Sequence, residues 1–171
     1  KGRGPRPSSS GEGVMTISAK MIADSVSADS PRLCTLQLRY PKFIHGELMT
    51  HRVFSRNASS SRAIPVGRLI QDVIDDPVYP SHWGKNQPGM SADQEHDEMV
   101  SDFDSQFGPA SREYTWDRAR ESAIYFAQMF AAAGYHKQIV NRLLEPFVHI
   151  NVVVTATQWR NFLAQRDHPG A

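Results

Sequence analysis

The sequence predicts an α+β fold, and three segments carry that prediction. Residues 33–40 alternate between a polar and an apolar face, as a half-buried strand does. Residues 148–156 contain three consecutive valines, which indicates a strand too apolar for a wet surface. Residues 112–133 repeat apolar side chains every three or four positions, which is the spacing of one helix face. The expected buried stripe of that helix consists of Trp116, Ala119, Ala123, Phe126 and Phe130.

The elements before residue 77 follow from alternation, polarity and the positions of prolines. Residues 15–27 alternate in part and are expected to form a strand ahead of the one at 33–40. A helix is expected from 41 to about 53, because Pro41 fits the first helical position. Residues 55–62 are predicted to be a polar loop, and Pro65 starts a helix that ends before Asp75-Asp76-Pro77. The side chains of the first helix expected to face the core are Phe43, Ile44, Leu48 and Met49.

The second half begins with loops and ends with regular elements. Residues 77–90, rich in proline and glycine, are expected to form a long surface loop. The acid-rich residues 91–105 are expected to form a solvated helix at best. Gly134 is a natural cap for the helix at 112–133. A short helix at 136–145 would bury Ile139, Val140, Leu143 and Leu144, before the strand at 148–156 and a last helix at 158–166.

Charge and cysteine content exclude several classes of protein. Lysine and arginine total 19 and the acids 18, so the net charge of +1 lacks the basic excess of a general nucleic-acid binder. The single cysteine excludes an intramolecular disulfide and fits a reducing compartment, most simply the cytoplasm. No apolar run approaches the length of a transmembrane helix. Residues 1–14 include nine Gly, Pro or Ser and are expected to be a disordered leader or a cloning remnant, with residues 15–171 as the domain.

One stretch of the chain concentrates positive charge. Between Arg39 and Arg68 there are six lysines and arginines, and Glu47 is the only acid. Its centre, HRVFSRNASSSR, combines arginines with small serines. Guanidinium groups suit phosphates, and small side chains let backbone N–H groups approach an anion. Composition alone leaves two interpretations open: an anion-binding loop, or a solvated turn whose serines cap the next helix.

The order of residues in this stretch resembles the signature of the flavin-dependent thymidylate synthases, also called thymidylate synthase complementing proteins. That signature is Arg-His-Arg, seven residues, then Ser, and here His51-Arg52 precedes Ser60 and Ser61-Arg62. A second block, HKQIVNRLLEP, then a strand and TATQWRNFLAQR, is similar to the family's later block. The resemblance covers most of residues 33–171, is closest to the phage-type branch, and implies that a C-terminal part is missing.

The resemblance implies a fold, a reaction and an assembly. The fold would be a mainly antiparallel sheet flanked by helices. The reaction would be the reductive methylation of dUMP to dTMP, with methylenetetrahydrofolate as carbon donor and NADPH-reduced FAD as hydride carrier. The assembly would be a homotetramer with sites at subunit interfaces, in the cytoplasm, or in the host cytoplasm if a phage encodes it. Neither nucleic acid nor membrane is expected as a partner.

The resemblance also assigns roles to individual residues. No residue is expected to act as a covalent nucleophile, no metal is expected, and Arg166 would orient the base. The expected dUMP-binding residues are Glu47, Thr50, Ser60, Ser61, Arg62, Arg142 and Arg166. The expected FAD-binding residues are His51, Arg52, Thr155, Thr157 and Asn161.

Two alternatives stay open. Thr50 stands where the family has the first Arg of its signature, and Ser61 stands where it has Gly. The Thr50 departure, together with the C-terminal part that the resemblance implies is missing, favours a catalytically inactive, truncated relative that still binds nucleotide or flavin. A small nucleic-acid-binding protein using the basic stretch is the other alternative, and the near-neutral charge argues against it. Outside these blocks, His82-Trp83 could stack on a ring or simply pin its loop.

Overall fold

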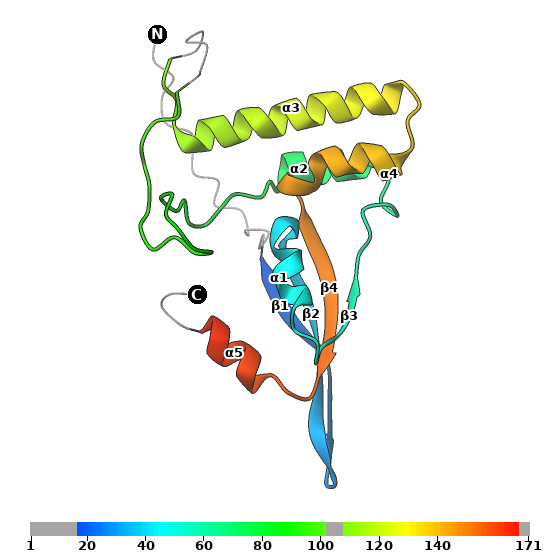
Figure 1. Ribbon diagram of the computed structural model, residues 1–171. Coiled ribbons are helices and arrows are strands. Elements are labelled where there is room, and N and C mark those ends of the chain that lie inside the picture. Colours follow the sequence, from blue (N-terminus) through cyan, green and yellow to red (C-terminus); the bar gives the residue numbers. More distant parts are fainter. Residues whose placement is uncertain (1–16, 102–107, 168–171) are drawn as a thin grey trace, which may run out of the picture.

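The chain folds around a four-stranded antiparallel sheet, which confirms the α+β class (Figure 1). The computed structural model describes residues 17–101 and 108–167, so the leader expected at 1–14 lies outside the described residues. The spatial order of the strands is β1-β2-β4-β3. The strands are β1 (Ser18–Ser27), β2 (Ser30–Pro41), β3 (Ser55–Ala58) and β4 (His149–Ala156).

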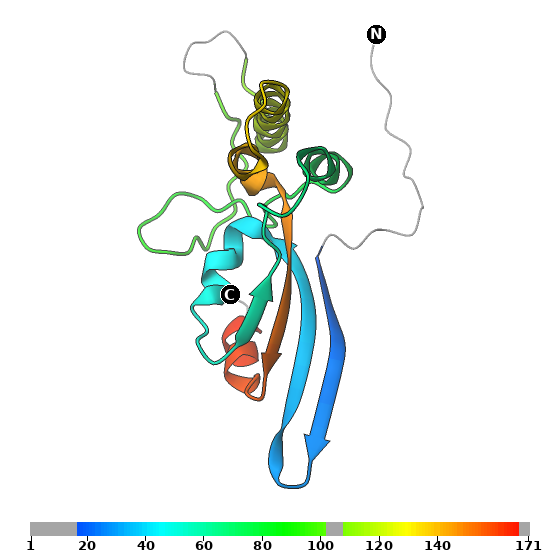
Figure 2. The same cartoon turned by 90° about the vertical axis from the view of Figure 1, so that its right-hand side faces the viewer.

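The helices lie above the sheet and on one of its faces. α1 and α5 lie on the same face, whereas α3 runs above the end of the sheet with α2 and α4 beneath it (Figure 2). Within the described residues, no helix is long and apolar enough to cross a membrane. The helical elements are the 3₁₀-helix η1 (Lys42–Ile44), α1 (His45–Met49), α2 (Val66–Asp75), α3 (Arg112–Ala132), α4 (Lys137–Val140), the 3₁₀-helix η2 (Asn141–Phe147) and α5 (Arg160–Arg166).

The described residues form two separate hydrophobic clusters. The helical cluster lies between α2, α3 and the α4–η2 segment, and the sheet cluster lies between the strands, α1 and α5. The helical cluster contains Leu69, Ile70, Val73, Ala127, Val140, Leu144, Phe147 and Val148. The sheet cluster contains Leu48, Phe54, Ile150, Val152, Val154 and Ala156, with Trp159 and Phe162 packed against it.

β4 is the strand that joins the sheet together, because it pairs with β2 on one side and with β3 on the other. Val152 and Val154 are buried, whereas Val153 points to the opposite face and is 37% exposed. The expectation of a continuously buried valine run is therefore wrong. In the described part of the chain, helices cover one face of the sheet (Figure 2), so the strand alternates between buried and exposed side chains as a half-covered strand does.

The segment between β2 and α2 differs from the sequence prediction in two ways. The helix expected at 41–53 is a 3₁₀ turn followed by a helix that ends at Met49, and Phe43 and Met49 are about half exposed. A helix this short presents one buried side chain, Leu48, to the sheet. The loop expected at 55–62 contains strand β3, which pairs with β4 from Ser55↔Thr155 to Ala58↔Val152. The side chains of β3 are polar or small, so they lack the alternation of apolar and polar residues that predicts a strand. An edge strand can nevertheless form through backbone pairing alone.

The later helices form where they were expected, with different buried faces. Ala119 and Phe126 of α3 are exposed, and Ala127 takes the central buried position instead. Apolar side chains lie on two sides of α3, so their spacing could not select the side that packs. For the same reason Ile139 and Leu143 are exposed beside buried Val140 and Leu144. The described part of 91–105 forms no helix; it makes isolated bridges, Gly84↔Glu95 and Val100↔Ala110.

A buried histidine at the start of β4 should make the fold sensitive to acid. The His149 side chain is 3% exposed, and its Nδ1 lies 3.6 Å from Asp76 Oδ2. Burial, together with the charge of Arg39, holds the pKa of His149 below its ordinary value. The unfolded chain then binds a proton at a higher pH than the folded chain. The free energy of unfolding should therefore be unaffected above about pH 6.5 and fall as the pH drops below it, towards the lower folded pKa.

Urea unfolding of the wild type and of His149→Gln over this pH range measures the effect. Gln cannot be protonated, so the variant should lose less stability on acidification than the wild type does. Parallel pH profiles for the two proteins would contradict the assignment to His149.

Candidate functional site

The turn between α1 and β3 is held by one arginine. Arg56 Nη1 donates to the carbonyl oxygens of Leu48 at 3.0 Å, Met49 at 3.1 Å and His51 at 2.6 Å. A cation at this end of a helix interacts favourably with its unpaired carbonyls. Arg56 therefore fixes the turn that presents His51, which is half-buried, and Arg52, which is exposed.

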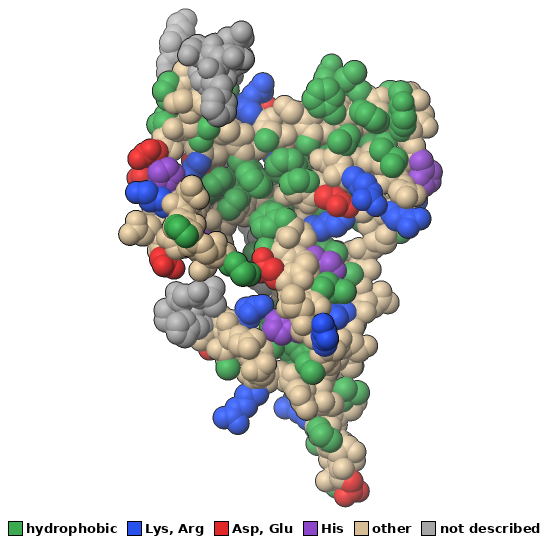
Figure 3. Space-filling model, viewed as in Figure 1, with side chains coloured by type: hydrophobic (Ala, Val, Ile, Leu, Met, Phe, Trp, Pro, Cys, Tyr) green, Lys and Arg blue, Asp and Glu red, His purple; other side chains and the backbone are tan. Residues whose placement is uncertain are grey.

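His51 contacts the last helix. Arg166 Nη2 donates to His51 Nε2 at 3.1 Å, and the ring of Phe162 stands edge-on to the imidazole with centroids 5.0 Å apart. The guanidinium of Arg166 lies 5.6 Å from the centre of the Phe162 ring, which is cation–π geometry. Figure 3 shows basic side chains and a histidine gathered where α1 meets α5. The structure thus brings together two segments that are 115 residues apart in the chain.

A pocket of about 270 Å³ opens between these two helices. We call it the α1–α5 pocket. Its floor is apolar, and its charged groups are Glu47 and Arg166, both expected to bind nucleotide. Thr50 lies outside it and donates its hydroxyl to the carbonyl of Glu47 at 2.7 Å. The residues that line the pocket are Leu38, Tyr40, Ile44, Glu47, Leu48, Phe162 and Arg166.

The other expected nucleotide residues form a second group, beyond β3 and next to η2. This serine-loop group consists of Ser60, Ser61, Arg62 and Arg142. Buried Asn141 donates to the carbonyls of Ser61 at 2.7 Å and Ile64 at 2.9 Å. Ser61 Oγ donates to Glu145 Oε1 at 3.0 Å, and Lys42 Nζ lies 2.5 Å from the same oxygen. The hydroxyl of Ser61 is therefore engaged within the chain, while Arg62 and Arg142 are exposed.

Glu145 is ionised beside this loop. Burial alone would raise the pKa of its carboxyl, but the hydrogen bonds from Lys42 and Ser61 and the charge of Arg142 outweigh burial and hold that pKa below its ordinary value. The carboxylate pairs with Lys42, whereas Arg62 and Arg142 are exposed and accessible to an anion.

Asn141 should be essential to the shape of the serine loop. Replacing it with Leu keeps the volume but removes both N–H donors, so the Ile64 carbonyl loses its bond from Asn141 and the Ser61 carbonyl keeps the bond from the Ile64 backbone N–H at 3.4 Å. We expect the free energy of unfolding to fall by about 1–3 kcal/mol, measured by urea unfolding. Asn86→Leu, at an exposed loop position, is the matched control and should change stability little. Equal losses in the two variants would show that the paired amide of Asn141 has no special role.

Within one chain, the residues of the α1–α5 pocket and those of the serine-loop group do not form one site. In the described residues, no hydrogen bond or ion pair links Glu47, His51 or Arg166 to the serine-loop group. None of the serine-loop residues lines the α1–α5 pocket. The expected dUMP-binding set is therefore split between two places on the chain.

The expected FAD-binding residues are divided by α5. His51 faces Phe162 on one side of that helix. Thr157 and Asn161 line a separate pocket of about 540 Å³ together with exposed Arg160, which the sequence analysis did not single out. Thr155 lies further back on β4, where its hydroxyl is 2.9 Å from that of Thr35.

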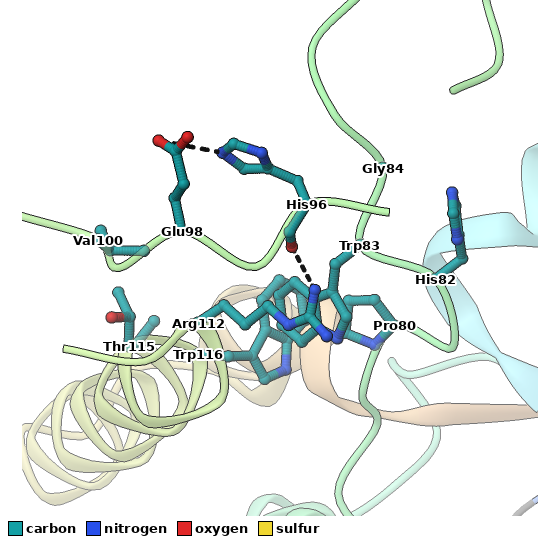
Figure 4. Close-up of a pocket in the computed structure, with 11 residues that line it drawn as sticks. Pro80, His82, Trp83, Gly84, His96, Glu98, Val100, Arg112, Thr115 and Trp116 are labelled. Carbon is teal, nitrogen blue, oxygen red and sulfur yellow. Dashed lines mark hydrogen bonds and ion pairs between the residues drawn. The ribbon is translucent and has the colours of Figure 1, made fainter. Parts of the chain in front are cut away.

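A third pocket, of about 480 Å³, lies between the 80–100 loop and the start of α3 (Figure 4). Two of its lining side chains, Arg112 and His82, pair with carboxylates that lie outside the lining. Arg112 lies 2.8 Å from both Glu95 and Glu113 and 5.5 Å from the centre of the Trp83 ring, and His82 Nδ1 lies 2.6 Å from Glu95. These contacts agree with the interpretation that His82-Trp83 pins its loop. None of the expected dUMP or FAD residues lines this pocket.

The fold of this chain is similar to that of a protein of known structure. A UMP/dUMP methylase, PolB from Streptomyces cacaoi, bound with 5-Br dUMP, superposes with a TM-score of 0.54 and 16% identity over 82% of this chain and 72% of that chain. The chain shares its fold with a nucleotide methylase. The same methylase bound with 5-Br UMP gives a TM-score of 0.51 and 17% identity, over 82% of this chain and 70% of that chain. No protein-family model and no curated protein sequence matches the chain.

At this identity the likeness to the methylase is a likeness of fold, and the chemistry depends on this chain's own side chains. The sequence analysis missed three of them, Tyr40, His45 and Arg56. His45 stands two positions before Glu47, an expected binding residue, and this proximity was the signal in the sequence that could have drawn attention to it. Arg56 was counted as one more cation of the basic stretch. The described residues contain no group of three or more His, Cys, Asp and Glu side chains placed to bind a metal ion.

Proposed function

We propose that the chain is a thymidylate synthase of the flavin-dependent kind, which methylates dUMP to dTMP in the cytoplasm. The observation that carries the proposal is the α1–α5 pocket, which Glu47 and Arg166 both line above an apolar floor, with Arg166 hydrogen-bonded to His51. An apolar pocket with a few fixed polar groups suits a flat heterocycle. The fold shared with a UMP/dUMP methylase supports the choice of a pyrimidine nucleotide.

The two groups of side chains suggest a division of labour. In the α1–α5 pocket, Arg166 would orient the pyrimidine ring by donating to its carbonyl edge, and the Glu47 carboxylate would accept from a ring N–H. In the serine-loop group, Arg62 and Arg142 would bind the nucleotide phosphate, because guanidinium groups pair with phosphate through two donors. A single copy keeps these two halves apart. We therefore propose a homotetramer in which each site takes one half from each of two copies.

FAD fits the donors around α5. Thr157, Gln158, Arg160 and Asn161 line the open pocket of about 540 Å³ and offer hydroxyl, amide and guanidinium donors to phosphate or to flavin carbonyls. His51 and Arg52 lie on the fixed turn at the other side of the helix. When bound, FAD would pass on the hydride that NADPH supplies, and methylenetetrahydrofolate would supply the carbon. The chain's own part is to bind, to orient and to exclude water.

Two measurements of binding and one of turnover on the purified chain test the function, and dUMP binding is measured by calorimetry. FAD is added, the free cofactor is removed, and the visible absorption bands of bound flavin are recorded. Then dUMP carrying tritium at C5 is supplied with FAD, NADPH and methylenetetrahydrofolate, and tritium release is followed. Bound flavin with release supports the synthase. Bound flavin or bound dUMP without release identifies the alternative, an inactive nucleotide- or flavin-binding relative. A protein that binds neither contradicts both.

A further inference from the structure

A tyrosine–histidine pair at the α1–α5 pocket has no part in the function proposed above. Tyr40, on β2, lines the pocket together with Glu47 and Arg166. Its hydroxyl lies 2.7 Å from Nδ1 of His45, the first residue of α1. The two rings are stacked, with centroids 6.1 Å apart and an interplanar angle of 27°. The pair thus connects the wall of the pocket to a second titratable group behind it.

The surroundings keep both members of the pair uncharged at neutral pH. Burial raises the pKa of Tyr40 to about 12, although the positive charge of Arg56 works in the opposite direction. Burial and the charges of Lys42 and Arg56 lower the pKa of His45. These are the charged groups that face His45: Lys42 from η1 and Arg56 from β3, with Tyr40 from β2. In the neutral tautomer of His45 that carries its proton on Nε2, Nδ1 accepts a hydrogen bond from the Tyr40 hydroxyl.

The proposed reaction needs an acceptor for one proton. At C5 of the pyrimidine a hydrogen is replaced by a methyl group. The carbon donor supplies CH₂ and the reductant supplies a hydride, which together make the methyl group. The hydrogen on C5 must then leave as a proton, and its bonding electrons stay in the ring. An acceptor positioned at the pocket can raise the rate of such a step by about 10²- to 10⁴-fold.

We propose that Tyr40 and His45 form a proton relay that receives the C5 proton; this inference rests on the proposed function. The proton moves to Tyr40 Oη while Tyr40 passes its own proton to His45 Nδ1. The phenol is regenerated and His45 becomes an imidazolium, which returns the proton to solvent from its half-buried position. Nearby Lys42 and Arg56 disfavour the imidazolium, so His45 is reset rapidly.

Removing one oxygen atom tests the relay. Tyr40→Phe keeps the ring but breaks the path to His45. We expect dUMP affinity, measured by calorimetry, to stay within about 3-fold, and tritium release from C5 to slow by about 100-fold or more. His45→Gln keeps an acceptor for the Tyr40 hydroxyl but cannot be protonated, so it should slow release similarly. The matched control is Tyr79→Phe, whose hydroxyl donates to Asp117 outside the α1–α5 pocket, and it should keep the wild-type rate.

A second readout does not depend on turnover. In ¹⁵N-histidine spectra, dUMP should shift the His45 Nδ1 resonance in the wild type and leave it in place in Tyr40→Phe. The pH–rate profile should also lose its acid limb, which lies below about pH 6.5 in the wild type, when His45 is replaced by Gln.

The outcomes separate the relay from the function. A wild type that releases tritium, with Tyr40→Phe releasing it equally fast, overturns the relay and leaves the synthase standing. A wild type that neither binds dUMP nor releases tritium overturns the synthase, and the relay with it. Slow release by Tyr40→Phe and His45→Gln at unchanged affinity, beside a normal Tyr79→Phe, supports the relay.

Discussion

Replacing Arg166 with Lys is expected to weaken dUMP binding by about 10- to 100-fold, the value of one charge-assisted hydrogen-bond pair. The guanidinium reaches the α1–α5 pocket from the last turn of α5, with Phe162 beneath it and His51 beside it. Lys keeps the charge but loses the planar fork and stacks less well on the ring. Calorimetric titration of dUMP into both proteins measures the change.

The control for Arg166→Lys is Arg118→Lys on α3, where the guanidinium pairs with Glu121 far from the pocket in the fold. Because Arg166 also donates to His51, flavin binding should weaken in the same variant. If dUMP and flavin bind equally well to Arg166→Lys and to the wild type, Arg166 is a solvent-facing helix-end cation and the α1–α5 pocket is not the pyrimidine site.

Two inactive variants should restore each other when they assemble together. In Arg62→Ala the serine-loop group is damaged, and in Arg166→Ala the α1–α5 pocket is damaged. If each site takes one group from each of two copies, hybrids made by co-expression contain some sites with both groups intact. Random assembly gives about a quarter of the sites intact, so tritium release should rise from near zero to about that fraction of the wild-type rate.

The control for this experiment pairs two variants damaged in the same group. Arg62→Ala and Arg142→Ala both alter the serine-loop group, so no arrangement of these chains gives an intact site and activity should stay near zero. Restoration by this control pair would mean that the groups are assigned wrongly. Absence of restoration by the Arg62 and Arg166 pair, with oligomers present, would mean that each copy builds its own site.

The sequence predicts the positions of most helices and strands, but few of the contacts between them. The helix that begins at Arg112 follows Ser111, whose side chain accepts from the backbone N–H of Tyr114, and such a cap depends on neighbouring residues alone. β3 could not be predicted because it forms by pairing with β4, which is far away in the sequence, and its polar side chains show no strand pattern. The buried faces of α3 and of the α4–η2 segment depend on which neighbours they meet, and periodicity cannot show this.

The candidate site shows the same limit. The motif named His51 and Arg166 but could not show that they touch, or that Arg62 lies elsewhere. The pair formed by Tyr40 and His45 was missed because neither residue belongs to the motif, and only the meeting of β2 with α1 puts the hydroxyl beside the imidazole. Arg56 was missed because a charge count does not distinguish an arginine that faces solvent from one bonded to three carbonyls.

The two hydrophobic clusters imply that the molecule does not unfold as one cooperative unit. The helical cluster and the sheet cluster share no buried residue, and the chain passes between them twice, from Phe54 to Leu69 and from Val148 to Ile150. Units of this kind commonly open with their own free energies. Backbone amides of α2 and α3 should therefore exchange with deuterium as one set, and those of β2 and β4 as another. A ligand held by the α1–α5 pocket would slow exchange mainly in the second set. Exchange would thus report which half of the molecule a ligand has bound, even before the ligand is identified.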